Sequence, residues 1–326
     1  MARLTTLVLP ALVALTPVLA AAQSKGPDYP NRPIRMLIPF APGGATDIIA
    51  RMIEPRMSRA LGQQIVVDNR AGAAGNIAVE LTAQAQPDGY TLLVGNISTN
   101  SINPILFAGR TKVNAVKDLA GVTKLVAIPN FLLGSPKMPP ALKEAIEYAK
   151  ARPGQLNYGA PLGSYSHLDM LAFTAKAGIQ MVHIPTKGAG ETLTNLLRND
   201  SNIQISNVAS NIGPVRAGQI RAYAVTGAKR IAEAPNVPTM AEAGFPGIGS
   251  DNWNGLFAPA RTPKAVIAKL HATAVIAMRE LEAEGVLEKR QTPISLSASP
   301  ADFDAYVLSE MRRWEGIIRS NKVTID

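Results

Sequence analysis

The chain has 326 residues, of which 33 are Lys or Arg, 24 are Asp or Glu and none is cysteine. The absence of cysteine excludes disulfides, thiolate metal sites and cysteine nucleophiles. A net charge of +9 is compatible with a nucleic acid, a membrane surface or an anionic ligand as partner. The basic residues are scattered and form no dense or aromatic-interleaved run, so we expect no nucleic-acid partner.

The N-terminal residues predict export. A short positive start precedes an apolar run from Leu4 to Leu19 that is broken by prolines, and small residues follow at 20–22. This layout is typical of a secretory signal peptide, so residues 1–22 are assigned to one, with cleavage expected between Ala20 and Gln23. A retained anchor is the alternative. No later stretch contains the about 20 consecutive apolar residues that a spanning helix needs.

Short apolar strands then alternate with amphipathic helices, which predicts an α/β fold with largely parallel sheets. Strands are expected at 34–38, 65–67, 90–94, 156–158, 181–184, 203–206, 221–225 and 253–258. Helices are expected after Pro42-Gly-Gly44, after Gly72 to Asn76, at 142–149, 167–177 and 191–198, and from Thr262-Pro263 and Ser299-Pro300 onward. The first helix should have Thr46 or Asp47 as its cap and should kink, or lose one hydrogen bond, at Pro55.

The order of these elements predicts two lobes. The chain is expected to cross between them at 119–126 and 252–258, after an irregular segment rich in Pro and Gly at 234–249. One lobe would contain residues 28–123 and 246–326, and the other residues 124–245. The last helices should return to the first lobe. An apolar stripe on the final helix, which includes Phe303 and Trp314, is interpreted as core packing.

The most informative local pattern is Pro42-Gly-Gly-Ala-Thr-Asp47, which lies between a strand and a helix. Glycines allow a tight turn whose amides can converge on an anion, and the helix N-terminus adds about half a positive charge. An ordinary strand-to-helix turn is an equally good interpretation. The residues do not form a phosphate loop, because no Gly-x-x-x-x-Gly-Lys-[Ser/Thr] pattern is present.

Two further strands end in similar loops, Asn96 to Thr99 and Gly159 to Ser166. Ligands of open α/β sheets bind beyond the carboxyl ends of the strands. If the lobes face each other, these loops line one cleft from two sides, and their helix N-termini suit a ligand with an acid group at one or both ends.

Catalytic interpretations find weaker support. Ser164, Ser166 and His167 raise the possibility of a secreted serine hydrolase, but the stretch lacks Gly-x-Ser-x-Gly. Neighbouring Ser and His residues at one helix start point in different directions, so His167 is interpreted as a cap, a packing residue or a ligand donor. Three scattered histidines without paired carboxylates make no metal signature. We therefore expect no enzyme activity, no cofactor and no metal.

Longer motifs show a family resemblance. Tyr29-Pro-Asn-Arg-Pro-Ile34, Pro39-Phe-Ala-Pro-Gly-Gly-Ala-Thr-Asp47, Val67-Asp-Asn-Arg-Ala-Gly72 and Pro87-Asp-Gly-Tyr-Thr-Leu-Leu93 resemble the receptors of tripartite tricarboxylate transporters, called Bug-type receptors. Asn157-Tyr-Gly159, Lys187-Gly188 and Val237-Pro-Thr-Met-Ala-Glu-Ala-Gly244 extend the match over almost the whole mature chain.

The resemblance implies a two-lobed periplasmic binding protein (Venus flytrap) fold with two crossing strands. It also implies a periplasmic location and membrane permease subunits as partners. We expect the receptor to be a monomer. Backbone amides and bridging waters would hold a ligand carboxylate. The matching candidate ligand-binding residues are Phe40, Ala41, Gly43, Gly44, Thr46, Asp47, Asn96, Ser98, Thr99, Pro161, Leu162, Gly163, Ser164, Tyr165, Ser166, His167, Thr186, Lys187, Gly188, Ser206 and Asn207.

Three departures from the family pattern bear on the ligand. The loop Ala160-Pro-Leu-Gly-Ser-Tyr165 is bulkier and more apolar than the usual Gly/Ser-rich loop, Thr186 replaces a common Tyr, and Ser206-Asn207 replaces a common Asp-Asn pair. The loss of an acidic residue favours an aromatic or aliphatic carboxylate over an amino acid. The predicted function is thus capture of a small organic carboxylate for a transporter. A receptor that signals to a membrane kinase is the first alternative, and the secreted hydrolase the second.

Overall fold

The computed structural model describes residues 29–324, apart from 228 and 321. The predicted signal peptide, residues 1–22, lies outside the described residues. No helix in the described part of the chain is both long enough and apolar enough to cross a membrane.

The first lobe is built on a five-stranded sheet in the order β2-β1-β3-β10-β4. Its strands are β1 (Ile34–Ile38), β2 (Ile65–Asn69), β3 (Thr91–Asn96), β4 (Leu119–Ile128) and β10 (Asn252–Pro259). Strand β1 is parallel to β2 and β3, whereas β10 is antiparallel to β3 and β4. The prediction of largely parallel sheets is wrong at β10 and in the three-stranded sheet of the second lobe. Strand β10 is antiparallel because β4 leaves the five-stranded sheet for the other lobe and β10 brings the chain back in the opposite direction.

Helices cover both faces of this sheet, so successive residues of a strand enter different cores. Met36 and Ile38 of β1 pack against α1 (Ala45–Leu61) and α9 (Lys264–Ala283), while Leu37 between them faces the other side. The remaining elements of this lobe are η1 (Ala73–Gly75), α2 (Asn76–Ala83), η2 (Ser98–Ile102), α3 (Asn103–Leu106), α4 (Ala115–Asp118), α10 (Val286–Lys289) and α11 (Pro300–Ser320).

The final helix supports the second face of the sheet. Phe303, Val307, Trp314 and Ile318 of α11 are buried in one core cluster with Trp253 of β10. This confirms the interpretation of the apolar stripe as core packing. Helix α11 contacts β4 and helix α9 contacts α1, so both C-terminal helices pack on the first lobe.

The second lobe contains two small sheets. One has the order β8-β5-β9, in which β5 (Asn130–Gly134) is antiparallel to β8 (Ile203–Asn207) and β9 (Arg221–Val225). The other pairs β6 (Leu156–Ala160) with β7 (Met181–Pro185) in parallel. Four helices accompany these strands: α5 (Leu142–Lys150), α6 (Tyr165–Ala177), α7 (Ala189–Arg198) and α8 (Val208–Arg216).

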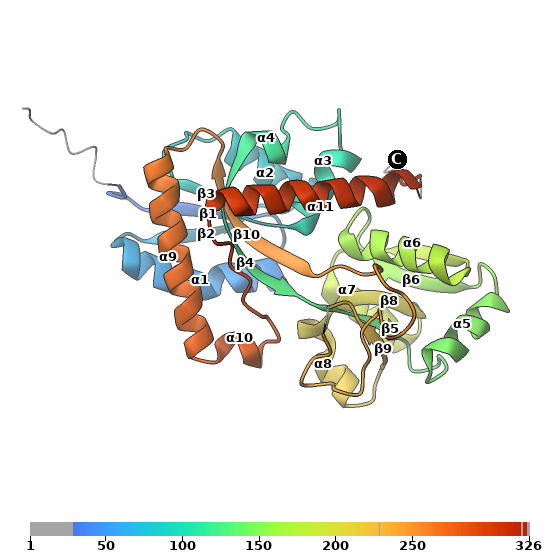
Figure 1. Cartoon of the computed structure of the whole chain (residues 1–326). Coiled ribbons are helices and arrows are strands. Elements are labelled where there is room, and N and C mark those ends of the chain that lie inside the picture. Colours follow the sequence, from blue (N-terminus) through green and yellow to red (C-terminus); the bar gives the residue numbers. More distant parts are fainter. Residues whose placement is uncertain (1–28, 228, 321, 325–326) are drawn as a thin grey trace, which may run out of the picture.

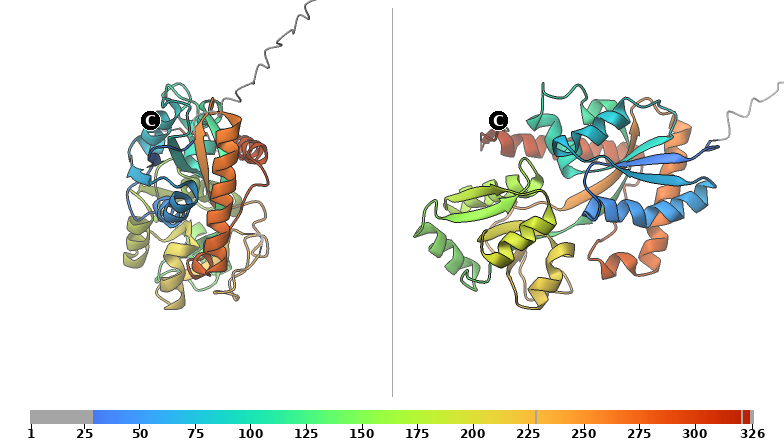
Figure 2. Two further views of the ribbon diagram at one scale, coloured as in Figure 1. Left: turned by 90° about the vertical axis from the view of Figure 1, so that its left-hand side faces the viewer. Right: turned by 180° about the vertical axis from the view of Figure 1, so that it is seen from behind.

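Two segments join the lobes (Figure 1). Strand β4 ends at Ile128 in the large sheet and β5 begins at Asn130 in the second lobe, so the sheets change at Pro129. The chain returns through an irregular segment that ends at β10, which pairs with β4 along its length. Figure 2 shows the two lobes from two further sides. The exact lobe boundaries at 123/124 and 245/246 stay a prediction.

The first helix corrects one expectation. Its N-cap is Gly44, with no side-chain cap hydrogen bond, rather than Thr46 or Asp47. Both of these residues lie inside the first turn, and Asp47 reaches back to the amide of Gly43, at 2.9 Å. Pro55 does not interrupt the helix, which runs to Leu61 and is closed by Gly62.

Candidate functional site

The loop between β1 and α1 presents backbone donors at a helix start. The first amides of a helix have no acceptor within the helix, and no side chain caps α1. Within the described residues, the amides of Gly44, Ala45 and Thr46 donate to no protein acceptor. Ala41 and Gly43 are exposed and Phe40 is half-buried. The loop therefore offers free donors and a positive helix end to an anion.

Asp47 holds this loop in shape. Its carboxylate accepts hydrogen bonds from the amide of Gly43 at 2.9 Å, from Asn69 Nδ2 at 2.9 Å and from Arg51 Nε at 3.0 Å. Burial opposes ionisation, but these hydrogen bonds and the charge of Arg51 outweigh it and lower the pKa of Asp47. Asn69 also donates to the carbonyl of Phe40, at 3.0 Å. The carboxylate is thus occupied by the protein itself.

A second strand end joins this loop. Asn96 Oδ1 accepts from the amides of Ser98 at 3.0 Å and Thr99 at 3.1 Å, which fixes the turn after β3. All three residues are buried. A Cβ on Gly75 would lie 2.6 Å from Thr99 Cγ2 and 3.1 Å from Pro39 Cβ, so η1 packs tightly between the two loops.

In the second lobe, Ser164 is the N-cap of α6 and its Oγ accepts from the amide of His167, at 3.4 Å. Ser166 Oγ lies 3.0 Å from Ser164 Oγ, and His167 Nδ1 accepts from the amide of Gly163, at 3.1 Å. The side chains of Ser166 and His167 therefore bond to other groups and not to each other. Helix α6 begins at Tyr165, two residues before the predicted start.

His167 is held as a neutral imidazole. Its ring stacks on that of His183 with centroids 4.1 Å apart, and the ring of Tyr158 also stacks on His183, with centroids 5.1 Å apart. Burial, with a smaller effect of His183, lowers the pKa of His167 to about 4. Because Nδ1 accepts a hydrogen bond, the proton of the neutral ring lies on Nε2.

The loop after β7 lies beside the loop after β6. The amide of Thr186 donates to the carbonyl of Ala160, at 3.1 Å, and Thr186 Oγ1 lies 2.8 Å from Thr192 Oγ1. Gly188 is the N-cap of α7 and no side chain caps that helix. The backbone amide of Lys187 is bonded to Glu191, and its side chain is exposed. This loop supplies a second uncapped helix start.

Ser206 and Asn207 end β8 and are buried. Asn207 Oδ1 caps α8 through the amide of Ser210, at 2.8 Å, while Asn211 Nδ2 donates to Ser206 Oγ, at 3.0 Å. In β5, Asn130 is the register partner of Asn207. Polar groups therefore lie together at the C-terminal end of β8 and the N-terminal end of β5.

The lobes touch at the start of α6. The amide of Tyr165 donates to Ser98 Oγ of the first lobe, at 3.3 Å. Within the second lobe, Tyr165 Oη donates to Asn130 Oδ1 of β5, at 3.1 Å. One turn further on, Leu168 is buried in the first lobe's cluster with Leu37 and Trp253. The structure thus brings the predicted loops 96–99 and 160–167 together. Pro161 and Leu162 lie on the same loop as this contact, and Leu162 is 44% exposed.

Three asparagines were missed by the sequence analysis. Asn254 of β10 accepts from Thr46 Oγ1, at 2.7 Å, Asn69 bonds to Asp47, and Asn130 bonds to Tyr165. Each is a polar residue near one end of a strand that also carries apolar residues, a signal that the sequence did contain. The described residues contain no group of three or more His, Cys, Asp or Glu that could hold a metal ion.

Two α/β lobes joined by paired crossing strands define the fold of a two-lobed periplasmic binding protein. The family model described as tripartite tricarboxylate transporter family receptor matches residues 49–323, and the chain belongs to this family. It is therefore a periplasmic solute-binding receptor, of the family that supplies the substrate-binding component of tripartite transporters, and not an enzyme.

Relatives and solved structures agree with this assignment. The chain is 33% identical over 302 residues to protein BugT of Bordetella pertussis, covering 92% of each chain. A solved structure of an R. palustris protein with adipate has a TM-score of 0.84 at 32% identity, covering 91% of this chain and 99% of that one. MatC from Rhodopseudomonas palustris with bound malate has a TM-score of 0.81 at 31% identity, covering 89% and 100%.

Proposed function

We propose that the chain captures a small aromatic or aliphatic carboxylate between its lobes and delivers it to the membrane permease subunits of its transporter. The observation that carries this proposal is the pair of helix starts: α1 with free amides at 44–46 in one lobe, and α6 bonded across to Ser98 from the other. Amides at helix N-termini favour a negative group. The similar structures with adipate and malate support an acid as ligand.

Within the proposed site, the loop 39–46 would hold one acid group through its amides. On the other side Ser166, whose amide follows the cap, and the Nε2 proton of His167 are donors for a second polar group. Lys187 is an exposed cation on the neighbouring loop. Asp47 has a different role, since its oxygens already accept from Gly43, Asn69 and Arg51: it fixes the loop and does not contact an anion.

The same geometry argues against an amino acid as ligand. An ammonium group needs a free carboxylate or several free acceptors. Among the candidate residues the acidic side chain is Asp47, which is occupied, and the loop 160–167 of the other lobe presents the apolar side chain of Leu162. The proposed ligand therefore has a carboxylate at one end and carbon at the other, or a carboxylate at both ends.

The test is isothermal titration calorimetry of the mature chain with adipate, malate, benzoate and glutamate, preceded by native mass spectrometry of the purified protein. We expect micromolar or tighter binding of at least one of the first three acids and none of glutamate. Tight glutamate binding without response to the others would refute the ligand class. Size-exclusion chromatography with light scattering checks the proposed monomer, and mass spectrometry of exported protein checks cleavage between residues 20 and 23.

Transport is proposed over signalling because the family is defined by its transporter. A receptor for a membrane kinase would bind its ligand through the same loops. Deleting the permease genes separates the two: uptake of the labelled ligand is then lost if the receptor serves transport, whereas a ligand-dependent transcriptional response persists if it serves a kinase.

A further inference from the structure

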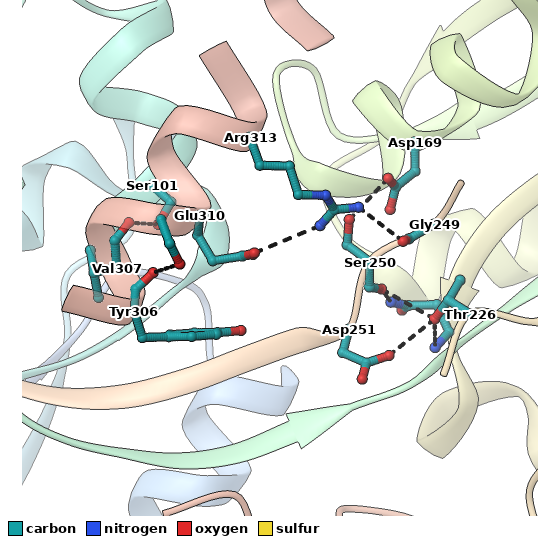
Figure 3. A network of polar contacts seen from close by, with 12 residues as sticks. Ser101, Asp169, Thr226, Gly249, Ser250, Asp251, Tyr306, Val307, Glu310 and Arg313 are labelled. Atoms are coloured by element: carbon teal, nitrogen blue, oxygen red, sulfur yellow. Dashed lines mark hydrogen bonds and ion pairs between the residues drawn. The ribbon is translucent and has the colours of Figure 1, made fainter. Parts of the chain in front are cut away.

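A group of charged side chains lies where α6, α11 and the returning segment meet (Figure 3). Asp169 of α6 is 1% exposed. Its Oδ1 accepts from Ser250 Oγ, at 3.0 Å, while Oδ2 is buried without a hydrogen-bond partner. Burying a carboxylate is costly unless it is fully paired. The ionised form of Asp169 is thus energetically unfavourable at this position. The residue lies one helical turn after Tyr165 of the candidate site.

Arg313 approaches the same place from the first lobe. One of its terminal nitrogens donates to the carbonyl of Gly249, at 3.1 Å, and the other lies 3.8 Å from Glu310 Oε1. Figure 3 shows the guanidinium between α11, Asp169 and the 249–251 segment. The positive charge of Arg313 stabilises ionised Asp169, whereas the negative charge of Glu310 destabilises it. Helix α6 is therefore tied to α11 through charge and through the returning segment.

The other ionisable groups around this cluster are Asp251, Lys124, Tyr306 and Tyr165. Asp251 accepts from Thr226 Oγ1, at 3.3 Å, and Lys124 Nζ lies 3.8 Å from the ring centre of Tyr306. Tyr165 lies on α6 itself, and burial raises its pKa, with a smaller effect of Asp169. Tyr165 therefore stays protonated at neutral pH and does not titrate in the same range as Asp169.

We propose that the present arrangement of the lobes is the closed one and that closure is coupled to uptake of a proton by Asp169 on the ligand-binding helix α6, with Arg313 as a positioning residue that sets the charge environment of this carboxyl group. The inference rests on the proposed function, because it assigns α6 to the site. Any rotation of the second lobe about the crossing strands changes the separation of Asp169 from Arg313. Such opening also lets water reach the carboxylate.

The direction of the coupling follows from burial. In the closed arrangement burial raises the pKa of Asp169 to about 7, although Arg313 and the Ser250 hydroxyl oppose the rise. When opening hydrates the carboxylate, its pKa falls toward the ordinary value, and the proton is released. Closure therefore takes up a proton near neutral pH. Lower pH favours closure and ligand binding, and the effect fades above the closed-state pKa, where both arrangements are ionised.

The chain has no cysteine, so two cysteines introduced by mutation can be spin-labelled specifically. The distance between the two labels then reports the separation of the lobes, with or without a ligand. Ala60→Cys in α1 and Lys143→Cys in α5 are exposed positions, one in each lobe, for spin labels. Double electron–electron resonance at pH 6 and pH 8 should show a larger closed population at pH 6. Asp169→Asn should remove this pH response. Arg313→Gln should move its midpoint to higher pH, while Arg313→Lys and the exposed neighbour Arg312→Gln should keep it.

Calorimetry with adipate, or with another acid of the panel that binds, gives the second readout. We expect about tenfold tighter binding at pH 6 than at pH 8 for the wild type, and no difference for Asp169→Asn. Thermal unfolding checks that each variant is folded. A wild-type pH response retained by Asp169→Asn, or no response in the wild type, overturns the inference. If no acid binds but the label distances respond through Asp169, the proposed function fails and the positioning role stands.

Discussion

The imidazole of His167 stacks on that of His183 with an angle of 9° between the rings, while its Nδ1 accepts the amide proton of Gly163. A proton added to Nδ1 would break that hydrogen bond and place a buried cation against a second imidazole. The loop that opens α6 is thus built around a neutral histidine. A loop built in this way should lose stability on acidification.

We expect His167 to destabilise the fold on acidification. The pKa of His167 is lowered to about 4, so below the ordinary value of 6.5 the unfolded chain takes up a proton that the folded chain does not. The free energy of unfolding should therefore be highest above pH 6.5 and should fall as the pH drops toward 4, by on the order of 3 kcal/mol in total. Urea unfolding of the wild type and His167→Gln at pH 7 and pH 4.5 measures it. A gap between the two proteins that does not change with pH would contradict the expectation.

The hydrogen bond from Thr46 to Asn254 predicts a specific cost. Both residues are buried and the bond measures 2.7 Å. Thr46→Val keeps the shape but leaves Asn254 Oδ1 without its donor, which should lower the free energy of unfolding by about 1–3 kcal/mol. Thr82→Val is the matched control, because the hydroxyl of this equally buried residue bonds only to a helix carbonyl, that of Ala78. Equal losses for the two variants would show that the bond contributes nothing special.

Gly75 should be required for its lack of a side chain. It has a φ of +92°, and a Cβ would lie 2.6 Å from Thr99 Cγ2. Gly75→Ala therefore meets both backbone strain and a clash with the loop after β3. Gly109→Ala has a similar φ of +79° but no atom within 4 Å of its Cβ, so it isolates the backbone strain. We expect Gly75→Ala to cost about 1–3 kcal/mol more than Gly109→Ala in denaturant unfolding and to weaken ligand binding as well. Similar costs with unchanged binding would exclude tight packing there.

The sequence predicts much of this architecture because the local signals are strong. Apolar β1 lies before Pro42-Gly-Gly44 and α1 lies after it, as pattern and turn chemistry predict. The cap of α1 was wrong for a physical reason: an aspartate is favourable both at the N-cap and in the first turn, and Asp47 acts from the first turn. Sequence alone does not decide between these positions.

Contacts between distant segments were beyond the sequence. Thr46 and Asn254 are 208 positions apart, and Ser98 and Tyr165 are 67 apart, so each pairing depends on how whole elements dock. Strand β5 and helix α8 were also missed. Pro214 lies inside α8, where proline argues against a helix, and the strand is a short apolar run with no periodic pattern.

The sharpest test of the proposed site is Gly44→Asp. Gly44 has a φ of −75° and a ψ of 165°, which suit any residue, and a Cβ would meet only the carbonyl of Ala41, at 3.7 Å. Aspartate is also a better N-cap than glycine, so the free energy of unfolding should stay the same or rise by a few tenths of a kcal/mol.

Binding of the acid should nevertheless fall about a hundredfold or more, because the new carboxylate takes the free amides of α1 and repels an anion there. Gly44→Asn, which has the same size and also caps the helix but carries no charge, should lose less. Calorimetry with the acid that binds the wild type, together with thermal unfolding, compares the three proteins. If Gly44→Asp binds as tightly as the wild type, the anion does not lie at the start of α1, and the ligand must be held by the second lobe instead.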